Sequence, residues 1–188
     1  MANFQTAFEI TMKHEGLYSN DPVDAGGETY MGITKTYHPT WKGWELVYDF
    51  QKEPNNEYLK KELNRSVKEF YKIMYWDRFQ GNLISEQNIA NELFDNAVNM
   101  GVHRSVKFLQ QGLNLLNRNQ KDYNDILVDG LFGNDTLNTL KIYLFIDNPI
   151  FLIKIMNILQ GMHYINYMNK DSKQERFARG WLKRVSIK

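Results

Sequence analysis

The pattern of apolar and polar positions along the chain predicts a mainly α-helical protein. Near the N-terminus, Phe4, Phe8 and Met12 lie one helical turn apart. Glu15 follows three residues after Met12, on the same face, and Gly16 then supplies a stop signal. We therefore expect an amphipathic helix that carries Glu15 on its last turn, next to the buried stripe.

Helical spacing of apolar residues recurs through the rest of the chain. Asn56 precedes one such stretch and is a favoured N-cap residue. Asn148-Pro149 opens another, because proline is favoured at the first helical position. In the last stretch, Phe177 and Trp181 are expected to face inward. The expected helices span residues 45–51, 59–76, 89–100, 105–116, 135–144, 149–168 and 175–184.

Between the first two predicted helices, the stretch from His14 to Thr34 holds four carboxylates and no Lys or Arg. Asn20-Asp21-Pro22 and Gly26-Gly27 are strong turn signals, so the segments that flank them are expected to pair as short strands. A small hairpin beside a helix that carries Glu15 would gather polar side chains around one cleft. These side chains belong to Asp21, Asp24, Glu28, Thr29 and Tyr30.

The predicted position of Glu15 affects its proton. An apolar neighbourhood and the negative end of a helix dipole both disfavour the charged carboxylate, so both raise the pKa of Glu15. A carboxylic acid that keeps its proton near neutral pH can serve as a general acid. The alternative is that Glu15 is a solvated residue at a helix end.

Four segments in this stretch resemble the signature of glycoside hydrolase family 108, a family of lysozyme-like N-acetylmuramidases. They are Glu15-Gly16, Asn20-Asp21-Pro22, Gly26-Gly27-Glu28-Thr29 and Gly32-Ile33-Thr34. The order also resembles the Glu/Asp/Thr arrangement of phage-type lysozymes. The resemblance implies a helical lysozyme-like fold with a small β-hairpin near the active site, and it implies Glu15 as the acid and Asp24 as the second catalytic carboxylate.

The third role of that arrangement is left open by the residues present. The position that matches the Thr is Tyr30, with Thr29 just before it. Both are therefore treated as supporting residues, together with Asp21, which is the second choice for the second carboxylate. Asp21 precedes a proline and is also suited to a purely structural turn role.

The second half of the chain resembles the peptidoglycan-binding-like module of the same family. The matching motifs are Phe94 to Asn99 and Asp129 to Gly133, and the segment Phe177 to Arg184 resembles the family's C-terminal pattern. We expect a lysozyme-like catalytic region over residues 1–90 and a helical module over residues 91–188. Because no flexible linker separates them, we expect one compact body.

Five residues are candidates for substrate binding. Tyr18 and Glu28 flank the predicted hairpin, and Trp41 lies in an aromatic segment with Trp44 that either lines a sugar groove or fixes a loop to the core. Asn96 and Asn99 lie beside the apolar face of a predicted helix. Because a buried polar group needs partners, these two either tie helices together or reach the cleft.

Composition excludes several other classes of function. The net charge of +1 gives no electrostatic case for nucleic-acid binding. The chain has no cysteine, and its four histidines show no metal-ligand spacing, so we expect neither a metal site nor any other cofactor. The apolar run over residues 149–167 contains Lys154 and His163 and is too polar to span a membrane, so no membrane insertion is expected.

The N-terminus shows neither a basic region nor an apolar region typical of a signal peptide. We therefore expect synthesis in the bacterial cytoplasm and action on the cell wall after holin-type or other export, as a monomer.

The sequence thus predicts a muramidase that hydrolyses the β-1,4 backbone of peptidoglycan glycan strands. Two other readings remain: a lytic transglycosylase, and a non-catalytic wall-binding or secretion-assembly protein. Whether the stereochemical outcome is retention or inversion depends on the separation of the two carboxylates.

Overall fold

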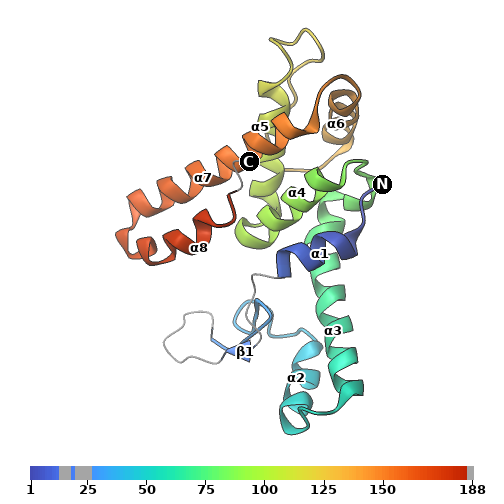
Figure 1. Cartoon of the computed structure of the whole chain (residues 1–188), viewed down its shortest axis with the longest axis vertical. Coiled ribbons are helices and arrows are strands. Elements are labelled where there is room, and N and C mark those ends of the chain that lie inside the picture. Colours follow the sequence, from blue (N-terminus) through green and yellow to red (C-terminus); the bar gives the residue numbers. More distant parts are fainter. Residues whose placement is uncertain (13–17, 20–26, 186–188) are drawn as a thin grey trace. The chain divides into compact units, whose positions relative to one another are not determined.

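A computed structural model describes residues 1–12, 18–19 and 27–185, and it is mainly helical (Figure 1). The chain forms two units: a small unit, Phe8–Met74, and a large unit made of Met1–Ala7 and Tyr75–Lys188. The α-helices are α1 (Phe4–Met12), α2 (Gly43–Lys52), α3 (Glu57–Tyr71), α4 (Gln87–Met100), α5 (Val102–Leu115), α6 (Asn134–Ile146), α7 (Pro149–Lys170) and α8 (Ala178–Leu182). The π-helix η1 (Lys72–Trp76) and the 3₁₀ helices η2 (Asp77–Phe79), η3 (Gly81–Leu83) and η4 (Ser172–Phe177) complete the helical segments.

The small unit contains a three-stranded antiparallel sheet of β1 (Tyr18–Ser19), β2 (Thr29–Tyr30) and β3 (Ile33–Thr34). β1 pairs with β2, as predicted for the segments that flank the turns, and Tyr18 lies opposite Tyr30. β3 adds a strand that the sequence analysis did not predict. Met31 and Gly32 join β2 to β3 with φ angles of 45° and 80°. Two positive φ angles are typical of the tight turns whose twist matches paired strands.

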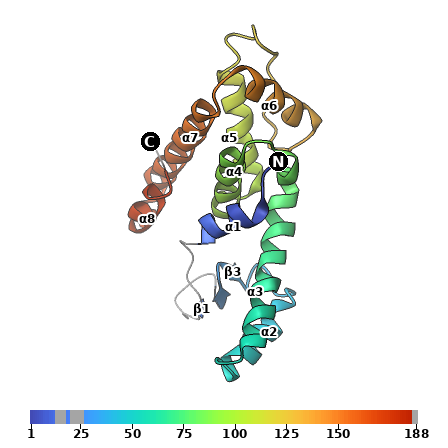
Figure 2. The ribbon, with the colours of Figure 1, turned by 45° about the vertical axis from the view of Figure 1, so that its right-hand side comes forward.

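The helices α2 and α3 pack against each other in the small unit (Figure 2). Leu63 and Val67 of α3 are fully buried, in agreement with the predicted stripe. Tyr71, at the end of α3, makes an edge-to-face contact with Phe8 and donates a hydrogen bond from its hydroxyl to the carbonyl of Met31 at 2.7 Å. This bond fixes the β2–β3 turn to the core.

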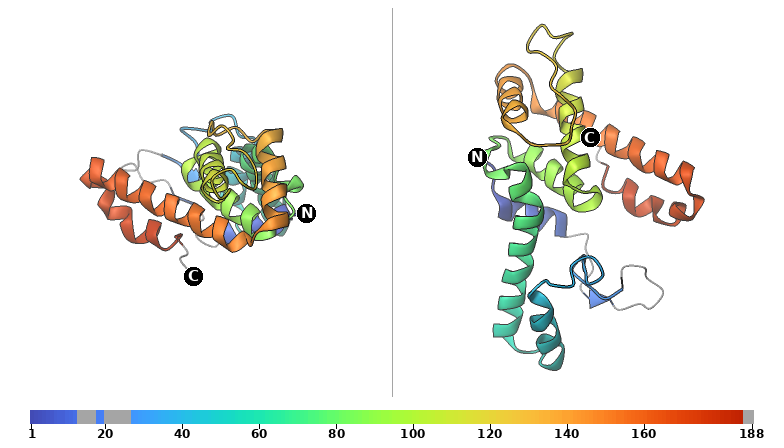
Figure 3. Two further views of the ribbon diagram at one scale, coloured as in Figure 1. Left: turned by 90° about the horizontal axis from the view of Figure 1, so that it is seen from above. Right: turned by 180° about the vertical axis from the view of Figure 1, so that it is seen from behind.

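The large unit is built on α4, α5 and α7, which pack on one another (Figure 3). Trp76 is fully buried and makes edge contacts with Phe4, Phe79 and Phe94. The apolar stripes that predicted α4 and α5 are buried too, including Leu93 and Leu109. Burial of these large side chains is the main source of stability for the unit.

Most helix boundaries follow the predicted signals, but two predicted helices are divided. The helix predicted over residues 59–76 is α3 followed by the π-helix η1. Asn56 caps α3 through its side-chain oxygen, and Asn148 caps α7 with proline at the first position. The single last helix predicted over residues 175–184 is wrong, because the chain forms η4 and then the short helix α8. Phe177 lies at the junction between them and is exposed, whereas Trp181 stacks on Tyr164 at 5.1 Å.

A buried glutamine holds the loop between α5 and α6. The Gln110 amide nitrogen lies within hydrogen-bond distance of the Asp129 carboxylate, the Leu131 carbonyl and the Thr136 hydroxyl, at 2.9–3.1 Å. Its amide oxygen accepts a bond from the backbone of Gly130 at 2.8 Å. One side chain therefore ties the loop to both helices.

Among the helices in the described part of the chain, none combines the length and the apolar character that crossing a bilayer requires.

Candidate functional site

The three acidic residues given the central catalytic roles, Glu15, Asp21 and Asp24, lie outside the described residues. Their assignments stay predictions. The other residues of the predicted cleft are described: Thr29 and Tyr30 form β2, and Glu28 directly precedes it. The site can therefore be built from the sheet and from the helix α2 that follows it in sequence.

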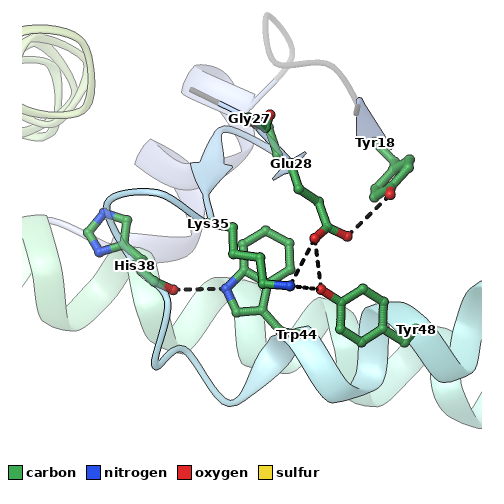
Figure 4. Close-up of polar contacts among 8 residues, drawn as sticks. Tyr18, Gly27, Glu28, Lys35, His38, Trp44 and Tyr48 are labelled. Carbon is green, nitrogen blue, oxygen red and sulfur yellow. Dashed lines mark hydrogen bonds and ion pairs between the residues drawn. The ribbon is translucent and has the colours of Figure 1, made fainter. Parts of the chain in front are cut away.

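Glu28 is the centre of a polar cluster in the small unit (Figure 4). Its Oε2 accepts a hydrogen bond from the Tyr48 hydroxyl at 2.7 Å and forms an ion pair with the Lys35 ammonium at 3.1 Å. Its Oε1 accepts a bond from the Tyr18 hydroxyl at 3.2 Å. Lys35 also donates a hydrogen bond to the Tyr48 hydroxyl and lies 4.8 Å from the centre of that ring.

The register of the β2–β3 hairpin explains why Glu28 and Lys35 meet. Thr29 pairs with Thr34, so Glu28 and Lys35 stand opposite each other one position further on. The backbone N–H of Lys35 donates to the Glu28 carbonyl at 2.8 Å. Opposite charges directly across a strand pair are stabilising.

The helix α2 supplies the other wall of the cluster. Tyr48 and Trp44 lie one turn apart on this helix, and both rings lie under the Lys35 ammonium. Trp44 is buried, and its indole nitrogen donates to the His38 carbonyl at 2.8 Å, which fixes the loop before α2 (Figure 4).

The contacts of Glu28 determine its charge. Its partial burial opposes ionisation, but the hydrogen bonds from Tyr48 and Lys35 and the positive charge of Lys35 outweigh it and lower the pKa of Glu28. The hydrogen bonds that the Lys35 ammonium donates to Tyr48 and Glu28 likewise raise the pKa of Lys35. At neutral pH this is a carboxylate–ammonium pair, which suits Glu28 to accept hydrogen bonds and not to donate a proton.

A pocket of about 370 Å³ lies next to this cluster. Tyr18 and Tyr30 line it from the sheet, and the other residues come from α2 and the turn after it: Val47, Phe50, Gln51 and Pro54. Tyr18 lines the pocket and also donates to Glu28, so the pocket and the carboxylate belong to one site. Burial raises the pKa of Tyr30, whose hydroxyl therefore stays protonated.

The remaining candidates of the small unit have structural contacts. Trp41 packs edge-on against Trp44 and Phe70. This is the arrangement expected if Trp41 fixes its loop to the core and does not line a sugar groove. The Thr29 hydroxyl donates to the Gly27 carbonyl at 3.2 Å. The catalytic support and substrate binding assigned to these two residues stay predictions.

Asn96 and Asn99 lie on α4 in the large unit. Asn96 is fully buried, and Arg184 lies within 2.7 Å of the Asn99 side-chain amide. The neighbouring Asp95 forms an ion pair with Arg184 at 2.9 Å, which ties α4 to the end of the chain. The contact of Asn99 with Arg184 matches the alternative of a structural role, whereas the side chain of Asn96 bonds to Glu92 on the same helix. A substrate-binding role for the two asparagines stays a prediction.

Sequence reasoning missed the carboxyl group of Glu92 on the same helix. It accepts a hydrogen bond from the Asn96 side chain at 2.9 Å and another from Asn157. Burial raises its pKa to about 7; Asp95 adds to this rise, and the two hydrogen bonds oppose it. Nearby, the side-chain oxygens of Asn96 and Gln160 are buried without a hydrogen-bond partner among the described residues.

A second pocket, of about 330 Å³, lies at the loop that Gln110 holds in the large unit. Exposed Leu127 and Leu131 line it together with Asp129, Asp135 and residues at the start of α6. Within the described ranges of the chain, no three His, Asp or Glu side chains come together to hold a metal ion.

Comparisons with known proteins match both halves of the chain. The family model described as Glycosyl hydrolase 108 matches residues 8–101, and the model described as Predicted Peptidoglycan domain matches residues 104–186. The solved structure of SagA from Brucella abortus is similar, with a TM-score of 0.63 and 22% identity over 97% of this chain and 88% of that chain. A search of curated proteins gave no match.

These matches and the mainly helical, lysozyme-like fold define a glycoside hydrolase that acts on peptidoglycan. The chain belongs to the glycosyl hydrolase 108 family, whose model covers half of it and includes the motif around Glu15. The family resemblance and the fold class predicted from the sequence are thus confirmed.

Proposed function

We propose that the protein hydrolyses the β-1,4-glycosidic bond between N-acetylmuramic acid and N-acetylglucosamine in peptidoglycan. The observation that carries this proposal is the Glycosyl hydrolase 108 match over residues 8–101, the segment that contains Glu15, Asp24 and the Glu28 cluster. The peptidoglycan domain match over residues 104–186 supports the same substrate.

In the proposed reaction, Glu15 donates its proton to the glycosidic oxygen as the bond from that oxygen to the anomeric carbon breaks. The anomeric carbon becomes cation-like, and the carboxylate of Asp24 acts in one of two ways. It either stabilises the carbon, in which case the Glu15 carboxylate takes the proton of the attacking water, or it takes that proton itself. The hydroxyl of the water completes the new reducing end, and the proton from Glu15 completes the hydroxyl of the leaving sugar. No cofactor takes part.

The Glu28 cluster supports a binding role beside this chemistry. A carboxylate with a lowered pKa, held by Tyr48 and Lys35, offers a fixed acceptor to a sugar hydroxyl or to the N–H of an acetamido group. The adjoining pocket presents the aromatic side chains of Tyr18, Tyr30 and Phe50, which suit the apolar face of a sugar ring or an acetamido methyl group.

We propose that the pocket beside Leu127 and Leu131 contacts the wall polymer in the second half of the chain. It lies within the segment matched as a peptidoglycan domain, and it combines exposed apolar side chains with the carboxylates of Asp129 and Asp135. Such a mixture suits a polymer that carries both methyl and amide groups.

The test is digestion of purified sacculi, followed by mass spectrometry of the released ends. Wild-type protein is expected to release fragments whose reducing end is N-acetylmuramic acid. Glu15→Gln removes the transferable proton and should lower the rate at least about a hundredfold. Glu9→Gln, an exposed site on α1, is the matched control and should keep the wild-type rate.

Three outcomes would overturn the proposal. Products that carry a 1,6-anhydro ring would indicate a lytic transglycosylase. Binding of sacculi by the wild type without release of fragments would indicate a wall-binding protein. An unchanged rate in the Glu15→Gln variant would remove Glu15 from the mechanism.

A further inference from the structure

The long helix α7 is apolar on two opposite sides. On one side, Leu152, Met156 and Tyr164 are buried in the large unit, where α7 packs against α4, α5 and α8. The opposite side is also apolar and is largely open to solvent. A helix that is apolar all round is expected to be covered all round, so the open side of α7 needs an explanation.

The open side carries four apolar residues, Phe151, Ile158, Met162 and Ile165, and Ile155 lies at its edge, next to Gly112 of α5. We call these five residues the α7 stripe. Their spacing alternates between four and three residues along the helix. Four of them are about half exposed, and Ile155 is partly buried. Alternating spacing of four and three is the pattern by which two helices pack along a common seam.

The area of the α7 stripe matches what a stable pairing requires. Half-exposed side chains of this size each leave roughly 100 Å² open, so the stripe offers on the order of 400 Å² of apolar surface. About 57% of the area of a typical interface is non-polar, so this apolar area corresponds to a total interface of about 700 Å² per copy. Stable complexes bury about 800 Å² per partner.

We propose that the α7 stripe is the contact surface between two copies of this chain, with their α7 helices antiparallel, so that the protein forms a dimer in place of the monomer expected from the sequence. This proposal does not depend on the glycosidase activity. A two-fold axis near Ile158 would place Ile158 against its own copy, Ile155 against Met162 and Phe151 against Ile165. An isologous contact of this kind needs one self-complementary patch, which the symmetric spacing of the stripe provides.

The charges on α7 favour the antiparallel direction. Lys154 and Lys170 are its only residues with a full charge, and the helix contains no acidic residue. A parallel pair would bring each lysine next to the same lysine of the other copy. In the antiparallel pair, Lys154 lies level with Met162 instead, and the two helix dipoles oppose each other favourably.

The first test measures the mass of the whole chain in solution by analytical ultracentrifugation. At about 100 μM, well above a micromolar dissociation constant, the wild type is expected at twice its 22.3 kDa. Ile158→Glu should give the monomer, because it places two carboxylates at the centre of the seam. Leu127→Glu changes an exposed apolar residue outside α7 and should keep the dimer.

The second test uses the absence of cysteine from the chain. Ile158→Cys should form a disulfide-linked dimer under mild oxidation. A mixture of Phe151→Cys and Ile165→Cys chains should cross-link to each other, whereas Phe151→Cys alone should not. A monomeric wild type at about 100 μM would overturn the proposal. This holds even if the chain were then found to bind lipid vesicles through the stripe. Self-cross-linking of Phe151→Cys would show a parallel pair and overturn the proposed direction.

Discussion

The buried carboxyl group of Glu92 predicts that a neutral replacement stabilises the protein above neutral pH. In the folded chain its pKa is about 7, against an ordinary value of 4.5, because burial disfavours the charge. Between these two values the unfolded chain releases the proton while the folded chain keeps it. The free energy of unfolding therefore falls as the pH rises from about 4.5 to about 7, and the loss is complete above that range.

The size of the effect follows from the same two pKa values. One pKa unit corresponds to about 1.4 kcal/mol, so the difference between the two pKa values sets an upper bound of about 3 kcal/mol on the loss in the free energy of unfolding. Because Glu92 is only partly buried by area, we expect about 2 kcal/mol. Glu92→Gln has nearly the same shape, and its amide can donate to an oxygen such as that of Asn96, which lacks a partner among the described residues.

The assay is thermal unfolding of both proteins at pH 5 and at pH 8. At pH 8 the melting temperature of Glu92→Gln should exceed that of the wild type by about 4–8 °C, and at pH 5 the gap should be much smaller. Glu175→Gln, an exposed site in the same unit, is the control and should change neither value. An equal or lower melting temperature for Glu92→Gln at pH 8 would refute the argument that burial holds this proton.

Three further predictions concern other parts of the chain. Tyr48→Phe removes the hydrogen bond that Tyr48 donates to Glu28, so the free energy of chemical unfolding at pH 7 should fall by about 1 kcal/mol and the KM for substrate should rise. Unchanged values would exclude Glu28 from the site. Asp24→Asn should lower the rate of sacculus digestion more than Asp21→Asn, and the reverse order in folded variants would transfer the role to Asp21. Gly130→Ala should lower the melting temperature, because Gly130 has a φ of +77° and a Cβ there would lie 2.6 Å from the backbone oxygen of His103. An unchanged melting temperature would show that the loop adapts freely.

The sequence alone was sufficient for those elements that local signals specify. The stripe that contains Leu63 and Val67 predicted α3, and Asn56 predicted its first turn, because helical periodicity and capping act over a few residues. The pairing of the segments that contain Tyr18 and Tyr30 was predicted from the turn signals between them.

The rest depended on contacts between distant segments. The ion pair between Lys35 and Glu28 was not predicted, because it depends on the strand β3, which was not predicted either. The glycine of the Met31-Gly32 turn was a usable signal for that strand. No local pattern announces that Tyr48 will reach Glu28 from a separate helix, 20 residues further along the chain. No local pattern predicts the raised pKa of Glu92, because it depends on burial by segments that are distant in the sequence.

The hydrogen bonds that Gln110 forms with the loop have a consequence for how the rim of the adjoining pocket can vary. Two of the atoms that Gln110 holds in the loop, the carbonyl of Leu131 and the N–H of Gly130, belong to the backbone and are present whatever side chains the loop carries. The exposed side chains at Leu127 and Leu131 can therefore be exchanged while the loop keeps its position. Evolution can vary the rim of this pocket one substitution at a time, on a frame that does not have to be rebuilt with each change.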